Sequence, residues 1–465
     1  MNELNGLEIA VIGIGCRFPK SANKKAYWEL LEKGECGISY FSEEELVKAG
    51  VSLRDIKNPN YVRAKGKLDD IEYFDASFFD YTEQEASHLN PQYRIILECA
   101  YNALLDGGYS ENKKNTSIGV YASEDINTYM FNLIEDPHKM NDISQIMMLN
   151  ANDFLATTIS YKLNLFGQSV NVQCGCSSSL VAVHMACQAL LSGDVDMALA
   201  GGVTVHLPNT SGYFYTPESK LSPDGQVYAL SQDAKGYVLS DGAGVVLLKR
   251  YEDAVRDKDP IYCVIKASYV NNDGRRKQNF AAPSDEGEYE AISNAFSIAE
   301  VESSTVSYVE AHGTGTLIGD MIELSAWSRY FRKNSDASKY CAIGSVDNNI
   351  GHTDCVSGIA KLIKVALMLQ NKKLVKNLNS TNPNHEISSD SSPFYINEEA
   401  KDWKVDSGVR RAAISSFGVG GTNAVLILEE AEQEKNEHVD EFQIMPLSTH
   451  SPVSMKQLKR ILQRS

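Results

Sequence analysis

Short apolar runs alternate along most of the chain with segments whose apolar residues recur every three to four positions. The runs typical of buried strands are 8–14, 116–121, 169–173, 195–205, 244–248, 262–269, 306–311, 341–346, 412–416 and 424–428. Helical spacing is found at 27–31, 91–108, 154–163, 180–191, 288–299, 320–331 and 357–369. This alternation predicts an α/β fold with a mainly parallel sheet that is covered by helices on both faces.

The helix predicted at 180–191 is apolar or small on nearly every side, and only His184 and Gln188 interrupt it. A helix of this kind is expected to be buried all round. Cys176 stands near its amino end, and the three serines that follow are expected to accept hydrogen bonds from the first helical amides. Because the positive end of a helix dipole favours a thiolate, Cys176 is a candidate nucleophile.

The other cysteines have a simpler interpretation, because a free cysteine in an intracellular protein is most often a small core residue. This interpretation applies to Cys16, Cys36, Cys99, Cys187, Cys263, Cys341 and Cys355. Cys174 and Cys176 together also suggest a metal site. However, no second cysteine pair and no His-x-x-x-His lies at zinc-site spacing, so the sequence predicts no metal.

The composition excludes some classes of binding partner. The 465 residues carry 44 basic and 61 acidic side chains, and the net charge of −17 argues against nucleic acid or an anionic membrane as the main partner. No apolar run reaches membrane-spanning length. Nine cysteines form no even disulfide framework and no charged-then-apolar leader opens the sequence, so we expect a cytoplasmic location.

The domain organisation follows from the strand and helix pattern, which begins again near residue 261. We therefore predict an amino-terminal half at 1–260 that carries the nucleophile and a second half at 261–430. Residues 431–465 are polar and acidic up to PLSTHSP and are predicted to be the start of a linker with a short helix.

Two segments of the second half combine a histidine with glycines, VEAHGTGTLIGDMIE with His312 and GSVDNNIGHTDCVSG with His352. In each, a buried-type strand ends in a polar loop before a helix, and ligands gather at such carboxyl ends of strands. Either histidine alone is more often structural. Two of them at equivalent strand ends, together with Cys176 at a helix start, indicate one active site.

The most specific blocks are CSSSL with VAVHMAC at 176–187, EAHGTGT at 310–316, NIGHT at 349–353 and SSFGVGGTNA at 415–424. With these blocks the chain resembles the β-ketoacyl synthases from about Glu8 to Glu430, specifically the ketosynthase domains of modular type I polyketide synthases. The resemblance implies the thiolase fold, in which two βαβαβ halves form a five-layer αβαβα body, and it implies a homodimer.

The resemblance also implies a function. Cys176 would take an acyl chain from the phosphopantetheine of an acyl carrier protein, with no cofactor bound by the chain itself. His312 and His352 would then stabilise the enolate that forms when a malonyl-type extender loses carbon dioxide, which makes the reaction a decarboxylative Claisen condensation. Further polyketide synthase domains are expected as partners.

Other site residues follow from the same blocks. The resemblance implies an oxyanion hole from the backbone amides of Cys176 and Val419. It also implies pantetheine binding by Thr314 and Thr316, although turn capping explains these threonines nearly as well from sequence alone.

The chain departs from the family pattern near these residues. Asp347 stands where the family has a lysine, five positions before His352. Other departures are Gln173, Cys174 and Gly175 before the nucleophile, Leu230 and Ser231 after LSPDG, Asn90, Lys235 and Val425. The nucleophile and both histidines are retained while the polar groups around them differ, and such changes impair geometry more than they abolish chemistry.

Three functions therefore remain open, namely an elongating ketosynthase, a thiol acyltransferase that passes or gates chains without condensation, and a silent partner similar to a chain-length factor. Cys176 counts against the third, and His312 favours the first over the second. Asp347 leads us to expect slow decarboxylation that Asp347→Lys partly rescues. Arg275, Arg276 and Lys277 are the candidates for carrier docking, although a solvated turn explains each of them singly.

Overall fold

The computed structural model describes residues 4–111, 116–134, 143–405, 408–432, 449 and 452–462. The chain divides into two compact units, Met1–Ala431 and Glu432–Ser465. In its described part the second unit contains the helix α16 (Pro452–Leu462). All other described helices and strands belong to the first unit.

Eleven strands of the first unit form one sheet. In spatial order they are β14 (Phe394–Ile396), β12 (Cys341–Gly344), β11 (Tyr308–Glu310), β16 (Arg411–Phe417), β17 (Thr422–Glu429), β10 (Cys263–Asn272), β1 (Ile9–Arg17), β9 (Gly242–Arg250), β7 (Met197–Thr204), β5 (Ile118–Glu124) and β6 (Ser169–Asn171). Each apolar run that predicts a strand coincides with one of them, and β14 lies outside the predicted runs.

The sheet is parallel toward both edges and antiparallel in its middle. β12 pairs in parallel with β14 and β11, β11 with β16, and β5 with β6 and β7. The pairs from β16 through β17, β10, β1 and β9 to β7 are antiparallel. The prediction of a mainly parallel sheet is therefore wrong for the centre. One reason is the short turn Gly418–Gly421 between β16 and β17, because so short a connection returns the chain antiparallel.

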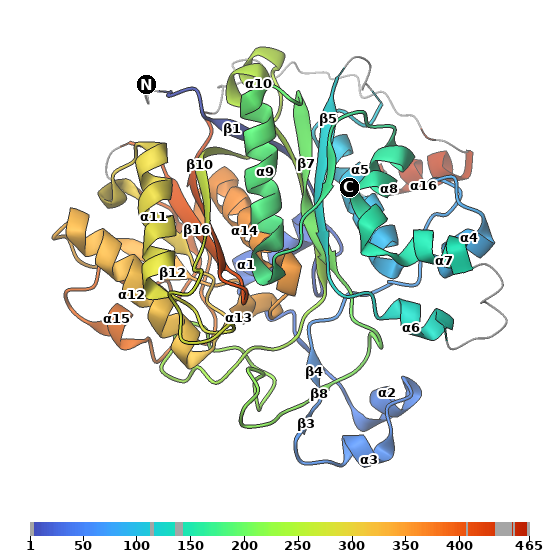
Figure 1. Cartoon of the computed structure of the whole chain (residues 1–465), viewed down its shortest axis with the longest axis horizontal. Coiled ribbons are helices and arrows are strands. Elements are labelled where there is room, and N and C mark those ends of the chain that lie inside the picture. The colour runs from blue at the N-terminus through green and yellow to red at the C-terminus, as the bar shows by residue number, and fades with distance from the viewer. Residues whose placement is uncertain are drawn as a thin grey trace. The chain divides into compact units, whose positions relative to one another are not determined.

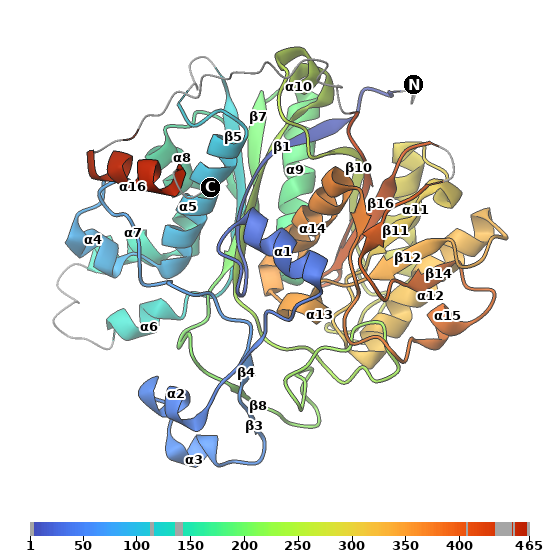
Figure 2. The ribbon, with the colours of Figure 1, turned by 180° about the vertical axis from the view of Figure 1, so that it is seen from behind.

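Helices form three layers on the faces of the sheet (Figures 1 and 2). The helices of these layers are α5 (Pro91–Asp106), α8 (Leu155–Leu163), α9 (Ser178–Ser192), α11 (Asp285–Ala299), α12 (Leu317–Asn334) and α14 (Ser357–Asn371). α9 and α14 lie between the two halves of the sheet, with α5 and α8 on one outer face and α11 and α12 on the other. Separate hydrophobic clusters fill the spaces between these layers, so the first unit has the predicted five-layer αβαβα body.

Further helices and strands connect these layers. The helices are α1 (Lys24–Lys33), α2 (Glu43–Lys48), α3 (Leu53–Ile56), α4 (Glu83–His88), α6 (Tyr129–Ile134), α7 (Ile143–Asn150), α10 (Tyr251–Asp257), α13 (Asp347–Ile350) and α15 (His385–Ser388). The two-residue strand pairs are β2 (Ser39–Tyr40) with β4 (Ala64–Lys65), β3 (Tyr61–Val62) with β8 (Tyr213–Phe214), and β13 (Lys373–Leu374) with β15 (Lys401–Asp402).

The crossing of α9 and α14 brings the amino ends of both central helices together. Gly358 makes the close approach possible, because a Cβ atom on it would lie 2.6 Å from the Leu180 Cβ atom. The Ile359 amide donates a hydrogen bond to Ser179 Oγ across the same contact, at 3.1 Å. By length and apolarity alone Gly175–Ser192 would pass as a membrane span, but most of it is buried, as expected for a core helix. The crossing therefore sets the separation of the loops that precede the two helices.

Candidate active site

Cys176 lies in a single 3₁₀ turn, Gly175–Ser177, that leads directly into α9, and its side chain is partly exposed. Gly175 allows this turn because its φ of 68° lies in the left-handed region that favours glycine. The following serines do not cap the helix amides as expected. Instead, Ser178 Oγ accepts a hydrogen bond from the Cys174 amide at 2.9 Å and donates one to the Gly175 carbonyl at 2.6 Å. Ser177 Oγ also donates to the Cys174 carbonyl at 3.1 Å, so Ser177 and Ser178 hold the nucleophile turn.

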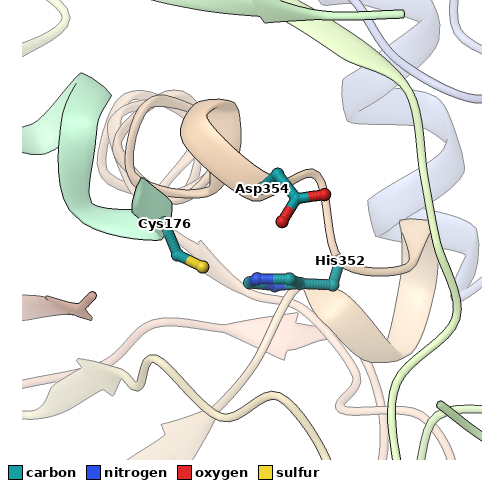
Figure 3. Close-up of side chains that lie close together, drawn as sticks. All are labelled: Cys176, His352 and Asp354. Atoms are coloured by element: carbon teal, nitrogen blue, oxygen red, sulfur yellow. The ribbon is translucent and has the colours of Figure 1, made fainter. Parts of the chain in front are cut away.

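His352 lies in the loop between α13 and α14, beside Cys176. The thiol sulfur, a ring nitrogen of His352 and a carboxylate oxygen of Asp354 all lie within 4.8 Å of one another. Figure 3 shows the Cys176 side chain pointing toward the edge of the His352 ring, with Asp354 close to both. Cys176 and His352 come from opposite halves of the sheet, so the helix crossing brings them into contact.

Asp347, the first residue of α13, holds the other side of the His352 ring. His352 Nδ1 lies 2.7 Å from Asp347 Oδ2, and both side chains are buried. An ionised carboxylate only accepts hydrogen bonds, so Nδ1 carries the proton and Nε2 is the nitrogen available to Cys176. Burial opposes the charged ring, but Asp347 and Cys176 outweigh it and raise the pKa of His352 well above its ordinary value. Nucleophile, histidine and carboxylate therefore form one connected group.

His312 follows β11 and stands edge to face with His352, with the ring centroids 5.6 Å apart. Its backbone amide donates to Glu323 Oε1 at 2.7 Å, which fixes the loop. Lys361 Nζ from α14 lies 3.2 Å from His312 Nδ1 and 3.0 Å from its carbonyl oxygen. Burial, then the positive charge of Lys361, lowers the pKa of His312 well below its ordinary value. Lys361 is not among the predicted site residues, although a lysine amid the apolar residues of a central helix is a usable signal.

A cavity of about 660 Å³ unites the predicted site residues. Its walls include Cys176, His312, His352, Thr314, Thr316 and Val419. The hydroxyl oxygens of Thr314 and Thr316 are 3.1 Å apart. Asp347 does not line the cavity and lies behind His352. The arrangement suits an extended acyl chain or pantetheine arm whose reactive end meets the thiol.

The turn after β16 reaches the nucleophile turn. A Cβ atom on Gly175 would lie 3.9 Å from the Val419 amide nitrogen, and one on Gly418 would lie only 2.7 Å from the Cys174 carbonyl oxygen. Glycine at position 418 is therefore needed for this close approach. The amides of Cys176 and Val419 thus stand on neighbouring turns, where the resemblance implies the oxyanion hole.

Nearly the whole chain matches known protein families. Residues 7–254 match the β-ketoacyl synthase N-terminal domain, residues 262–381 match the β-ketoacyl synthase C-terminal domain, and residues 383–465 match the ketoacyl-synthetase C-terminal extension. The chain belongs to the β-ketoacyl synthase family. The synthase is thus an acyl-transferring condensing enzyme of the thiolase superfamily, as the resemblance implies.

Its relatives are polyketide synthases. One polypeptide of the phenolphthiocerol/phthiocerol polyketide synthase of Mycobacterium tuberculosis (strain ATCC 25618 / H37Rv) is 44% identical over 439 residues, which cover 92% of this chain and 29% of that protein. Polyketide synthase PksN of Bacillus subtilis (strain 168) is 39% identical over 427 residues, 91% of this chain and 8% of that protein. The chain therefore spans less than a third of the length of these curated relatives.

Solved structures agree with the fold. Ketosynthase twelve of the bacillaene polyketide synthase of Bacillus amyloliquefaciens matches with a TM-score of 0.88 and 38% identity, over 92% of this chain and 76% of that one. The ketosynthase from module 6 of the bacillaene synthase of Bacillus subtilis 168 matches with a TM-score of 0.82 and 37% identity, over 92% and 72%. The predicted thiolase fold and polyketide synthase ketosynthase are confirmed.

Three other departures from the family pattern have polar partners in the structure. Asn90 Nδ2 donates to Glu124 Oε2 at 3.1 Å, and Gln173 Nε2 donates to the Glu124 carbonyl at 2.9 Å. Lys235 forms an ion pair with Asp224 at 2.7 Å. These positions therefore have partners of their own, which indicates a reorganised polar network.

Two of the departures have apolar side chains. Leu230 takes a positive φ of 66° and its amide donates to Asp320 Oδ2 at 2.7 Å, while Val425 is buried in the core beneath α11 and α12. Position 425, where the family has a histidine, therefore only fills the core.

The predicted docking residues have different surroundings. Arg276 is paired with Glu290 at 2.6 Å, and Lys277 Nζ donates to the Val419 carbonyl at 3.2 Å. Among the described residues Arg275 has no acidic partner within ion-pair distance. Lys277 therefore also supports the Val419 turn, and all three residues stay candidates for carrier docking.

Within the described part of the chain, two sets of side chains have the spacing of metal ligands, Cys176 with His352 and Asp354, and Asp125 with His206 and Asp354. Both ring nitrogens of His206 contact carboxylates, Nε2 with Asp125 at 2.8 Å and Nδ1 with Asp241 at 3.0 Å. These contacts raise the pKa of His206 to about 10 against the opposing effect of burial. A protonated imidazole does not bind a metal, so this set suits an ion-pair network better.

Proposed function

We propose that Cys176 takes an acyl chain from a carrier protein and that the chain is condensed in the same cavity with a malonyl-type extender held on the carrier's phosphopantetheine. The observation that carries the proposal is the meeting of Cys176, His352 and His312 in one cavity of about 660 Å³. Each has a different neighbour and therefore suits a different step. No cofactor of the chain's own is needed for either step.

Loading is the first step. The Cys176 sulfur attacks the carrier thioester, and the leaving sulfur takes a proton from His352 Nε2. The backbone amides of Cys176 and Val419 stabilise the oxyanion of the tetrahedral intermediate, while Thr314 and Thr316 bind the pantetheine arm. A covalent acyl-enzyme divides one difficult reaction into two easier ones.

Condensation is the second step. The extender loses carbon dioxide, and the imidazole N–H group of His312 stabilises the enolate oxygen. His352, whose Nδ1–H group is bound to Asp347, joins it after Nε2 has taken a proton back from water. The enolate carbon then attacks the acyl carbon on Cys176, and the thiolate leaves. The low pKa of His312 supports this role, because a neutral ring donates a hydrogen bond without bringing a second proton into the site.

A second candidate is transacylation or gating without condensation. It is favoured by one specific observation, the buried pair of His352 with Asp347 at 2.7 Å where the family has a lysine. A Cys–His–Asp group suits acyl transfer to and from thiols and leaves His312 as the one neutral donor for the enolate. The two candidates differ in whether carbon dioxide is released.

Homodimerisation and a cytoplasmic location complete the proposal, together with further polyketide synthase domains as neighbours. β6 is the last strand of the sheet, and Tyr161 and Phe166 beside it are 81% and 76% exposed. A sheet edge flanked by exposed aromatic rings is typical of a covered surface, and a second copy of β6 would pair with it. Light scattering of the purified chain at two concentrations tests for the dimer mass, and a monomer at both would contradict it.

Intact mass spectrometry tests the function. We expect one acyl adduct after incubation with an acyl carrier, none in Cys176→Ala, and an adduct heavier by one extender after malonyl carrier is added. Cys174→Ala is the matched control because Cys174 is two residues away and, like Cys176, is partly exposed. An adduct that persists in Cys176→Ala refutes the nucleophile, and loading without extension selects the second candidate.

A further inference from the structure

The two active-site histidines have buried neighbours of opposite charge. Lys361 contacts Nδ1 of His312 at 3.2 Å, and Asp347 contacts Nδ1 of His352 at 2.7 Å. The Lys361 and Asp347 side chains are fully buried, so neither charge is screened by solvent. The family's lysine is absent from position 347, and a lysine from a different element, α14, is present instead.

We infer that Lys361 and Asp347 are positioning residues that hold the two histidines in opposite protonation states. Lys361 keeps His312 neutral, with Nδ1 as an acceptor and the Nε2–H group directed to the cavity. Asp347 keeps His352 protonated on both nitrogens as the cation that faces Cys176. The inference rests on the proposed function for its consequences, but the protonation states themselves are measurable without any turnover.

The surroundings of His312 support its neutral state. An ammonium group has only donors, so its contact with Nδ1 requires that nitrogen to be unprotonated. His352 and Lys220 add further positive charge near the ring. The nearby Glu323 carboxylate accepts hydrogen bonds from the backbone amides of His312 and Gly313 and from Ser415 Oγ. No acidic group is therefore left to pair with an imidazolium at His312 among the described neighbours.

The surroundings of His352 support its cationic state. Asp347 Oδ1 has no hydrogen-bond donor within the described part of the chain, so the His352 ring is the group that offsets this buried charge. Cys176 and the carboxylates of Asp354 and Asp125 also face the ring and favour its protonated form. The Tyr237 ring covers another side at 5.1 Å between centroids and brings no charge at neutral pH.

Because His312 and His352 are in opposite protonation states, each suits a different step of the reaction. During loading, the bond from the acyl carbon to the carrier sulfur breaks as the bond to Cys176 forms, and the carrier sulfur leaves with the proton of His352. During extension, the carboxyl carbon of the extender leaves as carbon dioxide, and the electron pair that it leaves behind becomes an enolate that the neutral His312 stabilises.

Restoring the family's pattern of charges around the two histidines therefore takes two changes, Asp347→Lys together with Lys361→Ala. Asp347→Lys alone would add a second buried cation beside Lys361.

Alkylation tests the Asp347 half of the inference without a carrier. Iodoacetamide labelling of Cys176 is followed by intact mass across a pH series. We expect Asp347→Asn to lower the labelling rate at about pH 6 by about tenfold or more, because the imidazolium that supports the thiolate is lost. An unchanged pH profile in Asp347→Asn would overturn the assignment of His352.

Decarboxylation tests the Lys361 half. Lys361→Met should move the acid-side loss of carbon dioxide release from malonyl carrier upward by about one pH unit, because His312 then protonates more easily. Lys361→Arg should restore the profile. Lys364→Met is the matched control: Lys364 is one turn further along α14 and pairs with Glu310 at 2.6 Å, so its loss should lower the melting temperature without moving the profile. Equal profiles for Lys361→Met and the unaltered protein would overturn the assignment of His312.

Histidine ¹⁵N spectra separate this inference from the proposed function. If the unaltered protein releases no carbon dioxide at any pH, condensation fails while the spectra still decide the protonation states. We expect His312, assigned with His312→Asn, to show a neutral ring protonated on Nε2, and His352 to show a ring protonated on both nitrogens. A neutral His352 or a cationic His312 at neutral pH would overturn the inference.

Discussion

At the scale of single residues, several buried side chains stay charged although burial alone favours their neutral forms. His206 is the clearest case outside the catalytic group. Its two ring nitrogens contact Asp125 and Asp241, and Lys65 Nζ contacts the second oxygen of Asp241 at 2.7 Å. Burial opposes a charge on His206, yet the two carboxylates raise its pKa to about 10. The stability of this network therefore depends on a proton.

Replacing His206 with glutamine should lower stability in a pH-dependent way. The folded pKa lies above the unfolded value of about 6.5, so the stabilisation is complete below about pH 6.5 and is lost as the pH rises through about 10. We expect His206→Gln to lose about 2–4 kcal/mol at about pH 6, with a difference that shrinks toward about pH 10. Urea unfolding at several pH values measures it. The exposed His385→Gln serves as control, and a constant difference across the series would contradict the charge assignment.

At the scale of elements, the crossing of α9 and α14 sets the site geometry, and Gly358 is its closest point. Alanine normally stabilises a helix relative to glycine by up to about 1 kcal/mol. Here its Cβ atom would lie 2.6 Å from the Leu180 Cβ and 2.9 Å from the Leu180 backbone nitrogen. Leu180 lies four residues after Cys176, so a shift of α9 also moves the nucleophile.

Gly358→Ala should therefore destabilise the fold and slow the chemistry together. We expect a loss of about 1–3 kcal/mol from overpacking and a fall in acyl loading of about tenfold or more from the displaced thiol. Thermal unfolding and intact-mass loading rates measure the two effects. Asn371→Ala, at the exposed end of the same helix, should leave both unchanged. A gain in stability in Gly358→Ala would show that the helix propensity of alanine outweighs the overpacking and that α9 and α14 are free to move apart.

The sequence predicts most elements because their apolar residues have only local spacing to satisfy. The meeting of Cys176, His312 and His352 in one cavity was predictable because each stands at the end of a strand or beside the end of a helix. The contact of Lys361 with His312 was not predictable, because the two residues are 49 positions apart and only the helix crossing brings them together. Strand direction in the sheet centre was also missed, since apolar runs read the same for parallel and antiparallel neighbours. The division at 1–260, 261–430 and 431–465 stays a prediction.

At the scale of the whole molecule, a net charge of −17 coexists with cations around the cavity. Lys220 and Lys235 line it, and Arg275 and Arg276 lie on the loop that leads to its wall. Lys235 and Arg276 are paired with Asp224 and Glu290, which reduces their local charge. The electrostatic attraction of an acidic carrier to this region is therefore expected to be modest and sensitive to salt.

Arg275→Glu with Arg276→Glu tests docking without touching the oxyanion turn, which Lys277 supports through its contact with Val419. We expect loading from an acidic carrier to slow by about tenfold at low salt, because a repulsive surface lowers the association rate. Loading from a small acyl thioester should not change, since it needs no docking. Lys25→Glu with Lys33→Glu on α1 makes the same change in net charge away from the cavity lining and should slow neither substrate. Equal slowing of both substrates, or equal effects of the two double variants, would place the carrier elsewhere on the surface.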